Sequence, residues 1–192
     1  MKFSVFLGSV REGRMGIRVA KYILNLLKAK KHDVFFFDPM ERPVPLLTKA
    51  FHHYEKPNDA PKWLQELHNE VVASDALIVV SAEYNYSIPP ALSNAMDHLP
   101  PSDYERKPCG IVSYSIGPFG GLNATAQLRS FLGILGLITP GFTFPIPNID
   151  KAFSEEGEPL NDHVRRNGKR IVEEVEWYAE AIKNQKLKKP FK

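Results

Sequence analysis

Short apolar runs alternate along this chain with segments in which hydrophobic residues recur every three or four positions. Each run is only four or five residues long, and the segments between them are long enough for a helix. Strands that are apolar throughout are buried on both faces, which is typical of a parallel sheet covered by helices on each side. The runs are Phe3–Leu7, Val34–Phe37, Ala76–Val80 and Gly110–Tyr114, with a fifth strand expected within Leu137–Phe144.

The alternation predicts an α/β fold: a flavodoxin-like, doubly wound five-stranded parallel sheet of order 2-1-3-4-5 with helices on both faces. Residues 1–185 form one expected domain, and residues 186–192 a basic tail. A proline-rich segment, 39–61, is long enough for a loop with a function or for one that covers a partner surface. The helices are expected from their apolar faces: Ile17, Ala20, Leu24 and Leu27; Trp63, Leu64, Leu67 and Val71; Leu92, Ala95, Met96 and Leu99, starting at Pro89 or Pro90; Thr125, Leu128, Leu132 and Leu135; and Ile171, Val175, Tyr178 and Ile182.

The composition excludes several classes of protein. The net charge of +3 is too small to indicate a nucleic-acid partner. No apolar stretch approaches the roughly 20 residues that cross a membrane, and the first residues do not form a signal peptide. The single cysteine, Cys109, excludes an intrachain disulfide and is expected to be a buried filler. We therefore expect a cytoplasmic protein without nucleic-acid or membrane partners.

The loop after the first strand, Gly8–Gly16, is the first candidate site. It places backbone N–H groups and the start of a helix at one point, which favours an anion. Ser9, Arg11 and Arg14 are able to donate to phosphate oxygens. Arg14-Met15 stands where a nucleotide-binding loop of Walker spacing needs Lys-Ser or Lys-Thr, so a terminal monophosphate fits better than a triphosphate. The alternative is a surface turn with two solvated arginines.

Two further loops follow strands three and four. Glu83–Ser87 has backbone N–H groups at Asn85 and Tyr86 that could meet a ring edge, and tyrosines that could pack on a flat ring. The glycine-rich segment Ser115–Gly121 allows a close backbone approach. The alternatives are a plain turn that caps the following helix, tyrosines that pack in the core or an interface, and a simple strand-to-helix turn.

Together the three loops resemble the NADPH-dependent FMN reductase family, which includes flavodoxin-like quinone and azo reductases. The resemblance implies bound FMN, NADPH or NADH as transient co-substrate, and a homodimer or homotetramer. Three features depart from the family pattern: Ala82 replaces a proline, Pro89-Pro90 replaces Pro-Gly, and neither Arg14 nor Met15 is a small hydroxyl residue. The matching pieces are Gly8-Ser9-x-Arg11 with Gly16; Glu83-Tyr84-Asn85-Tyr86-Ser87-Ile88-Pro89 with Leu92-x-Asn94-Ala95-x-Asp97; and Ser115-x-Gly117-x-x-Gly120-Gly121 with Gln127-Leu128-Arg129.

Carried over by position, the expected FMN-binding residues form three groups. The first would hold the phosphate, the second would flank the isoalloxazine ring, and the third would lie against its other edge. No metal site is expected, because the histidines lack ligand spacing, and no side chain is expected to act as a catalytic acid or base. The groups are Ser9, Arg11, Arg14, Met15, Gly16 and Ile17; Glu83, Tyr84, Asn85 and Tyr86; and Ser115, Gly117, Gly120 and Gly121.

The expected activity is that of an FMN-dependent NAD(P)H oxidoreductase. It would pass two electrons, by ping-pong hydride transfer, from a nicotinamide to quinones or related acceptors such as flavins, azo compounds and metal oxyanions. Two alternatives stay open. One is a flavodoxin-like electron carrier or redox-sensing flavin protein without turnover of small substrates. The other is a flavodoxin-like domain without flavin, which would be colourless.

Overall fold

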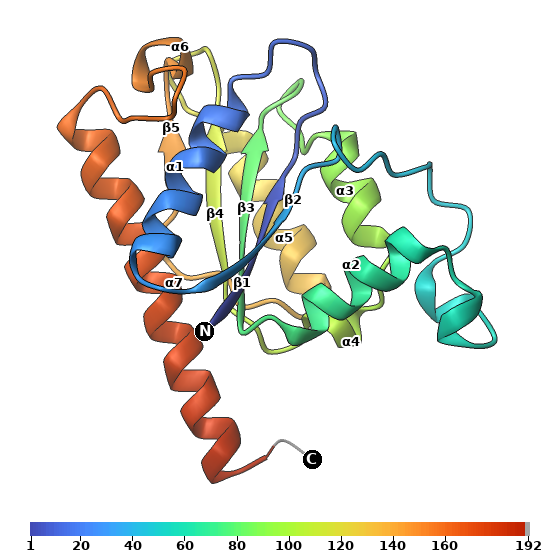
Figure 1. The fold of residues 1–192 in the computed structure, drawn as a ribbon. Coiled ribbons are helices and arrows are strands. Elements are labelled where there is room, and N and C mark those ends of the chain that lie inside the picture. Colours follow the sequence, from blue (N-terminus) through green and yellow to red (C-terminus); the bar gives the residue numbers. More distant parts are fainter. Residues whose placement is uncertain (191–192) are drawn as a thin grey trace.

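A computed structural model describes residues 1–190 and shows a five-stranded sheet in which every neighbouring pair is parallel. The order is β2-β1-β3-β4-β5, as the sequence predicts, and the arrows in Figure 1 all point to one edge. Every residue of the central strands β3 and β4 is buried, because helices cover both faces. The strands are β1 (Lys2–Leu7), β2 (Asp33–Phe37), β3 (Ala76–Ala82), β4 (Cys109–Tyr114) and β5 (Phe144–Ile146).

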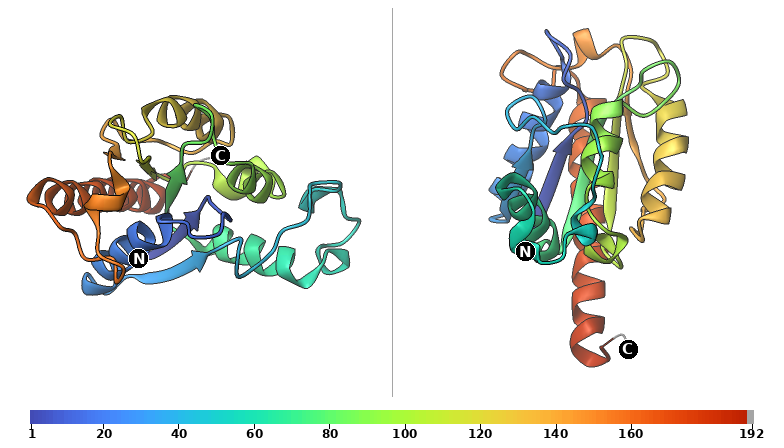
Figure 2. Two further views of the ribbon diagram at one scale, coloured as in Figure 1. Left: turned by 90° about the horizontal axis from the view of Figure 1, so that it is seen from above. Right: turned by 90° about the vertical axis from the view of Figure 1, so that its right-hand side faces the viewer.

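Five main helices form the two outer layers, seen edge-on in Figure 2. One half of the core packs α1 and α7 against the sheet, and the other half packs α2, α3 and α5 against the opposite face. The main helices are α1 (Gly16–Ala29), α2 (Lys62–Ala73), α3 (Pro90–Asp97), α5 (Leu122–Ile134) and α7 (Asp162–Lys188). The short ones are α4 (Pro101–Tyr104) and α6 (Ile149–Ala152), with the 3-10 turns η1 (Phe51–His53) and η2 (Pro57–Asp59). Along residues 1–190, no helix is both long and apolar enough to cross a membrane.

Three details differ from the sequence analysis. The fifth strand begins only at Phe144, after Pro140 and Gly141, whereas Ile138 forms just an isolated bridge with Pro108. Pro145 is tolerated because β5 is an edge strand that pairs with β4 alone. The short helix α4 has no counterpart among the expected elements. Helix α7 continues through Lys188, so residues 186–188 of the expected tail are helical, while residues 191–192 lie outside the described part of the chain.

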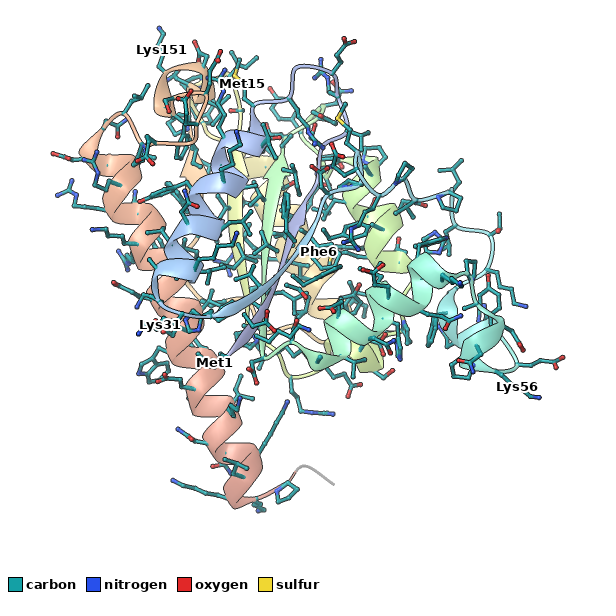
Figure 3. The ribbon with its side chains drawn as sticks, viewed as in Figure 1. Met1, Phe6, Met15, Lys31, Lys56 and Lys151 are labelled. Atoms are coloured by element: carbon teal, nitrogen blue, oxygen red, sulfur yellow. The ribbon has the colours of Figure 1, made fainter. Side chains whose placement is uncertain are left out.

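The segment 39–61 is fastened to α3 rather than left free. Asn94 Nδ2 donates to the carbonyl oxygen of Pro45 (2.9 Å), and Asn94 Oδ1 accepts from the amide of Leu47 (2.9 Å). The buried His98 ring donates to the same Pro45 oxygen at 3.1 Å, and the amide of Phe51 donates to the His98 carbonyl. Figure 3 labels Lys56 at the outer tip of this segment. The segment is therefore a strap along the helix that follows the second candidate loop.

Lys107 is a buried cation whose charge makes a pH-dependent contribution to stability. Its Nζ donates to the carbonyl oxygens of Val71 (2.5 Å) and Val72 (3.0 Å) at the end of α2, and burial lowers the pKa of Lys107 to about 8. Below pH 8 both the folded and the unfolded chain carry this proton. Between about pH 8 and 10.4 only the unfolded chain still carries it, so the folded state gains stability as pH rises.

We therefore expect the free energy of unfolding of the native chain, relative to that of Lys107→Met, to rise by about 2 kcal/mol between pH 7 and 10. Urea denaturation at several pH values measures this difference. Lys62→Met, which changes an exposed lysine at the start of α2, serves as control and should show a smaller change. A gap between native chain and Lys107→Met that stays constant with pH would contradict the expectation.

Candidate functional site

A cavity of about 320 Å³ lies at the carboxyl edge of the sheet, where the loops after β1, β3 and β4 meet. Figure 3 labels Met15 and Lys151 at this end of the molecule, and Met1 and Lys31 at the other. In open α/β sheets this edge is where ligands bind, at the point where the winding of the chain reverses. The cavity is lined by Ser9, Arg11, Glu12, Gly13, Arg14, Met15, Ala82, Glu83, Tyr84, Tyr114, Ser115, Ile116 and Ile149.

Half of the residues expected at the site line this cavity. They are Ser9, Arg11, Arg14, Met15, Glu83, Tyr84 and Ser115; Gly16, Ile17, Asn85, Tyr86, Gly117, Gly120 and Gly121 lie outside its lining. The sequence analysis did not assign to the site three lining residues at strand and helix ends, of which Ala82 is the last residue of β3. Tyr114 is the last residue of β4, and Ile149 begins α6. One feature of the sequence could have pointed to Tyr114: it is the only aromatic residue of β4, and it stands at the end of the strand where ligands bind.

Arg14 is bound by a carboxylate that the sequence analysis did not single out. Its guanidinium donates to both oxygens of Asp38, at 2.6 and 2.5 Å, and to the carbonyl oxygen of Ser9 at 2.6 Å. The two side chains are only 8% and 4% exposed, so this is a buried bidentate ion pair. Asp38 directly follows β2, the neighbour of β1, and the pair ties the first loop to the end of that strand. Arg14 therefore fixes the loop's shape.

The first and second loops touch each other across the cavity. The hydroxyl groups of Ser9 and Tyr84 form a short hydrogen bond. The guanidinium of Arg11 lies over the Tyr84 ring, 5.1 Å from its centroid, in a cation–π contact. Arg11 is itself exposed and lines the cavity, and none of the ion pairs within residues 1–190 gives it a carboxylate partner. This leaves Arg11, rather than Arg14, as the available cation of the first loop.

Residues 84–87 form a tight turn with a strained backbone. Tyr84 and Ser87 exchange both backbone hydrogen bonds, at 3.1 and 2.9 Å, and the central residues Asn85 and Tyr86 have φ angles of 50° and 62°. Positive φ at both central positions characterises the type I′ hairpin turn, where asparagine and glycine are favoured and a tyrosine is unusual. Among the described residues, no hydrogen bond engages the amide N–H of Asn85 or Tyr86. The turn thus offers two donors in a conformation that is costly to maintain.

Helix α5 supports this turn from below. The amide of Ala124 donates to Glu83 Oε2 at 2.9 Å, so Glu83 caps the start of α5. Gln127 Nε2 donates to the Tyr86 carbonyl at 2.6 Å, and Gln127 Oε1 accepts from the Ser87 hydroxyl at 2.8 Å. These three contacts keep the strained turn in place. The sequence analysis expects Glu83 beside the ring. In the structure its carboxylate joins the second loop to the start of α5, the helix that follows the third loop.

Two glycines allow the third loop to pack closely against the strands β4 and β5. Gly120 has a φ of +62°, and a Cβ there would lie 2.7 Å from the backbone nitrogen of Ile146. Gly121, with a φ of +82°, immediately precedes α5. The backbone of Gly117 accepts from the amide of Asn148 at 3.2 Å, which ties the loop to the segment after β5. The third wall of the cavity is therefore held by its own backbone contacts.

The free donors of the site suit a phosphate monoester joined to a flat, acceptor-rich ring. Helix α1 has no side-chain cap and no acidic residue in its first turn, so its N-terminal N–H groups and positive dipole end favour an anion. The unpaired amides of Asn85 and Tyr86 lie on the neighbouring loop and suit the ring edge. FMN combines these two groups, and the donors that the structure provides fit it.

Comparisons with known proteins agree with this geometry. The sequence profile described as NADPH-dependent FMN reductase matches residues 1–151. A quinone reductase of Escherichia coli K12 is 30% identical over 132 residues, which cover 67% of this chain and 68% of the relative. An NAD(P)H-dependent FMN reductase of Pseudomonas aeruginosa is 32% identical over 111 residues, 55% of this chain and 59% of the relative. The matched regions thus span about three fifths to two thirds of these two relatives.

A solved structure supports the fold. FerB, a flavoenzyme NAD(P)H:(acceptor) oxidoreductase from Paracoccus denitrificans, superposes with a TM-score of 0.72 at 21% identity and covers 95% of this chain and 97% of its own. The flavodoxin-like fold, the FMN cofactor with NAD(P)H as co-substrate, and the class of FMN-dependent oxidoreductase expected from the sequence are confirmed. By its profile match over most of its length and its similarity to the quinone reductase, the chain belongs to the NADPH-dependent FMN reductase family.

Proposed function

We propose that this protein uses bound FMN to pass two electrons, in a ping-pong sequence, from NADPH or NADH to quinones and related acceptors. The related acceptors are flavins, azo compounds and metal oxyanions. The observation that carries the proposal is that two kinds of free donor flank one cavity: the uncapped start of α1, next to the lining residue Met15, and the unpaired amides of Asn85 and Tyr86, next to the lining residue Tyr84. Relatives named quinone reductase and FMN-dependent NADPH-azoreductase support this range of acceptors.

The first loop would hold the phosphate. Ser9 would supply a hydroxyl, Arg11 an exposed charge, and the residues from Met15 to Ile17 the backbone N–H groups at the start of α1. Arg14 would act differently from Arg11. Because Asp38 holds its guanidinium, Arg14 keeps the loop in shape and contributes little net charge.

The second and third loops would hold the ring. FMN, when bound, supplies the redox chemistry, since its ring accepts hydride and then releases two electrons. The amides of Asn85 and Tyr86 would donate to the ring edge and stabilise negative charge there, as donors of an oxyanion hole do. Ser115 and Gly117 would lie along the opposite edge, and Tyr84 would pack beside the ring. No protein side chain is required as an acid or base.

The rim of the site is apolar and suits a flat acceptor or a second copy of the chain. Tyr86, Ile116 and Phe119 are 70%, 70% and 69% exposed. Exposed apolar clusters of this kind mark interaction surfaces. We propose a homodimer or homotetramer in which a neighbouring subunit partly encloses the flavin. We also propose that the protein is cytoplasmic. Sedimentation of the purified protein at several concentrations tests the assembly, and a monomer at all of them would contradict it.

The purified protein's visible spectrum tests the proposed activity. We expect flavin absorbance that bleaches when NADPH is added without oxygen and returns on addition of a quinone. A flavin that NADPH leaves oxidised would support the electron carrier instead, and a colourless protein that does not take up FMN would contradict both. The net charge of +3 disfavours the carrier, because flavodoxin-type carriers tend to be acidic.

Replacing Arg11 removes the free cation of the phosphate site. We expect Arg11→Ala to weaken FMN binding about tenfold or more, because a hydrogen bond to a charged group contributes about 1.5–3 kcal/mol. Riboflavin, which lacks the phosphate, should bind almost equally well to both forms. Quenching of flavin fluorescence measures the two affinities, and Arg166→Ala, an exposed arginine on α7, is the control. Unchanged FMN affinity in Arg11→Ala would refute the assignment.

A further inference from the structure

Tyr114 places a buried hydroxyl without a hydrogen-bond partner at the base of the candidate site. The residue is 6% exposed, and its phenol oxygen is one of two buried side-chain polar atoms without a partner among the described residues. Buried polar groups are nearly always paired, and an unpaired one costs free energy. The other such atom, Nδ1 of His98, belongs to a ring whose Nε2 bonds the strap at Pro45, and His98 is not among the residues that line the cavity.

The Tyr114 hydroxyl lies directly beneath the start of α1. A Cβ atom on Gly16 would lie 2.2 Å from it, so only glycine at position 16 leaves room for the phenol. Tyr114 also lines the cavity together with Ser9, Arg11 and Met15. The hydroxyl and the uncapped helix terminus therefore face the same small volume, although they come from β4 and α1.

Burial keeps this hydroxyl in its donor form. It raises the pKa of Tyr114 well above its usual value, and the neighbouring Tyr84 phenol adds to the effect, while the nearby Ser9 hydroxyl, Arg14 and the Gly16 amide act in the opposite direction with smaller effects. A protonated phenol is able to donate a hydrogen bond to an anion. Neither adjacent charged group is able to accept the phenol hydrogen, because a guanidinium carries only N–H donors, and that of Arg14 is already paired with Asp38.

We propose that Tyr114, whose phenol fits beneath Gly16, donates its hydroxyl hydrogen to the phosphate group of FMN. This rests on the proposed function and names a ligand residue that lies outside the three loops. The phosphate would receive donors from two directions: the first loop and start of α1 on one side, and the end of β4 on the other. A phosphate monoester satisfies the hydroxyl that the protein alone leaves unpaired, whereas riboflavin has no phosphate to do so.

Tyr114→Phe tests this, because it removes the hydroxyl and keeps the ring. With the full-length protein stripped of flavin, we expect FMN affinity to fall about ten- to hundredfold, the effect of one hydrogen bond to a charged group. Riboflavin affinity should change by less than about twofold. The flavin-free variant should melt at the same temperature as the native chain or higher, since an unpaired polar atom is lost.

Tyr104→Phe is the matched control. The Tyr104 hydroxyl is fully buried but donates to the Met96 carbonyl at 3.0 Å, away from the cavity. Its loss should lower the melting temperature and leave FMN affinity unchanged. FMN affinity that is equal in native protein and Tyr114→Phe, or equal losses for FMN and riboflavin, would overturn the assignment alone. A native protein that binds neither flavin would overturn the proposed function and this assignment with it.

Discussion

Asp38→Ala should lower the free energy of unfolding by about 3–5 kcal/mol, the usual cost of removing one partner from a buried ion pair. The substitution leaves the Arg14 guanidinium, 8% exposed, without its bidentate acceptor. It also removes the acceptor for the amide of Met40 at 3.0 Å. Urea denaturation of the flavin-free protein measures the loss. FMN should restore part of it, because its phosphate supplies a new acceptor for Arg14.

An exposed ion pair provides the control for Asp38. Arg42 and Glu66 are 2.7 Å apart, but their side chains are 44% and 54% exposed. Glu66→Ala should therefore cost less than about 1 kcal/mol. The double variant Arg14→Ala with Asp38→Ala should lose less than the sum of its single changes, because no buried charge is left unpaired. Similar losses in Asp38→Ala and Glu66→Ala would contradict the buried pair.

Gly120→Ala should be the second strongly destabilising change, at about 2–5 kcal/mol, from a positive φ together with a backbone clash. The φ of Gly120 is +62°, and the added Cβ would lie 2.7 Å from the nitrogen and 2.9 Å from the carbonyl carbon of Ile146. These are backbone atoms of β5 and cannot rotate away. The third loop would have to shift, so FMN affinity should fall with stability. Denaturation and flavin titration measure the two effects.

Gly133→Ala is the control, because this glycine has neither a positive φ nor a neighbouring atom that an added Cβ would meet. Gly133 lies within α5, and its added Cβ would meet nothing within 4 Å. Alanine is the better helix former, so stability should rise by about 0.5–1 kcal/mol. If Gly120→Ala were as well tolerated as Gly133→Ala, the close packing of the third loop on β5 would be wrong.

The sheet could be predicted because each of its main strands is recognisable from a few consecutive residues. Apolar runs define the four main strands wherever they occur, and the parallel order follows from their alternation with helices. The fifth strand was placed too early, because an edge strand of three residues containing Pro145 carries little pattern of its own. The three loops were located correctly at the ligand edge for the same reason: they directly follow recognisable strands.

The partners within the site could not be predicted from the sequence, because they depend on contacts between distant segments. Asp38 meets Arg14 only through the pairing of β1 with β2. Gln127 meets Tyr86 only once α5 packs below the second loop. The positive φ angle at Tyr86 also had no signal, since the residue expected after an asparagine in such a turn is a glycine.

In the turn at 84–87, cofactor binding and substrate preference depend on different parts of the same residue. We propose that its backbone amides hold the cofactor while the Tyr86 side chain, 70% exposed, faces outward from the same residue. Position 86 is consequently a place where substrate preference is adjustable without rebuilding the cofactor pocket. Asparagine or glycine there would keep the left-handed backbone and reshape only the rim. A small library at this one codon would sample acceptor selectivity at nearly constant flavin affinity.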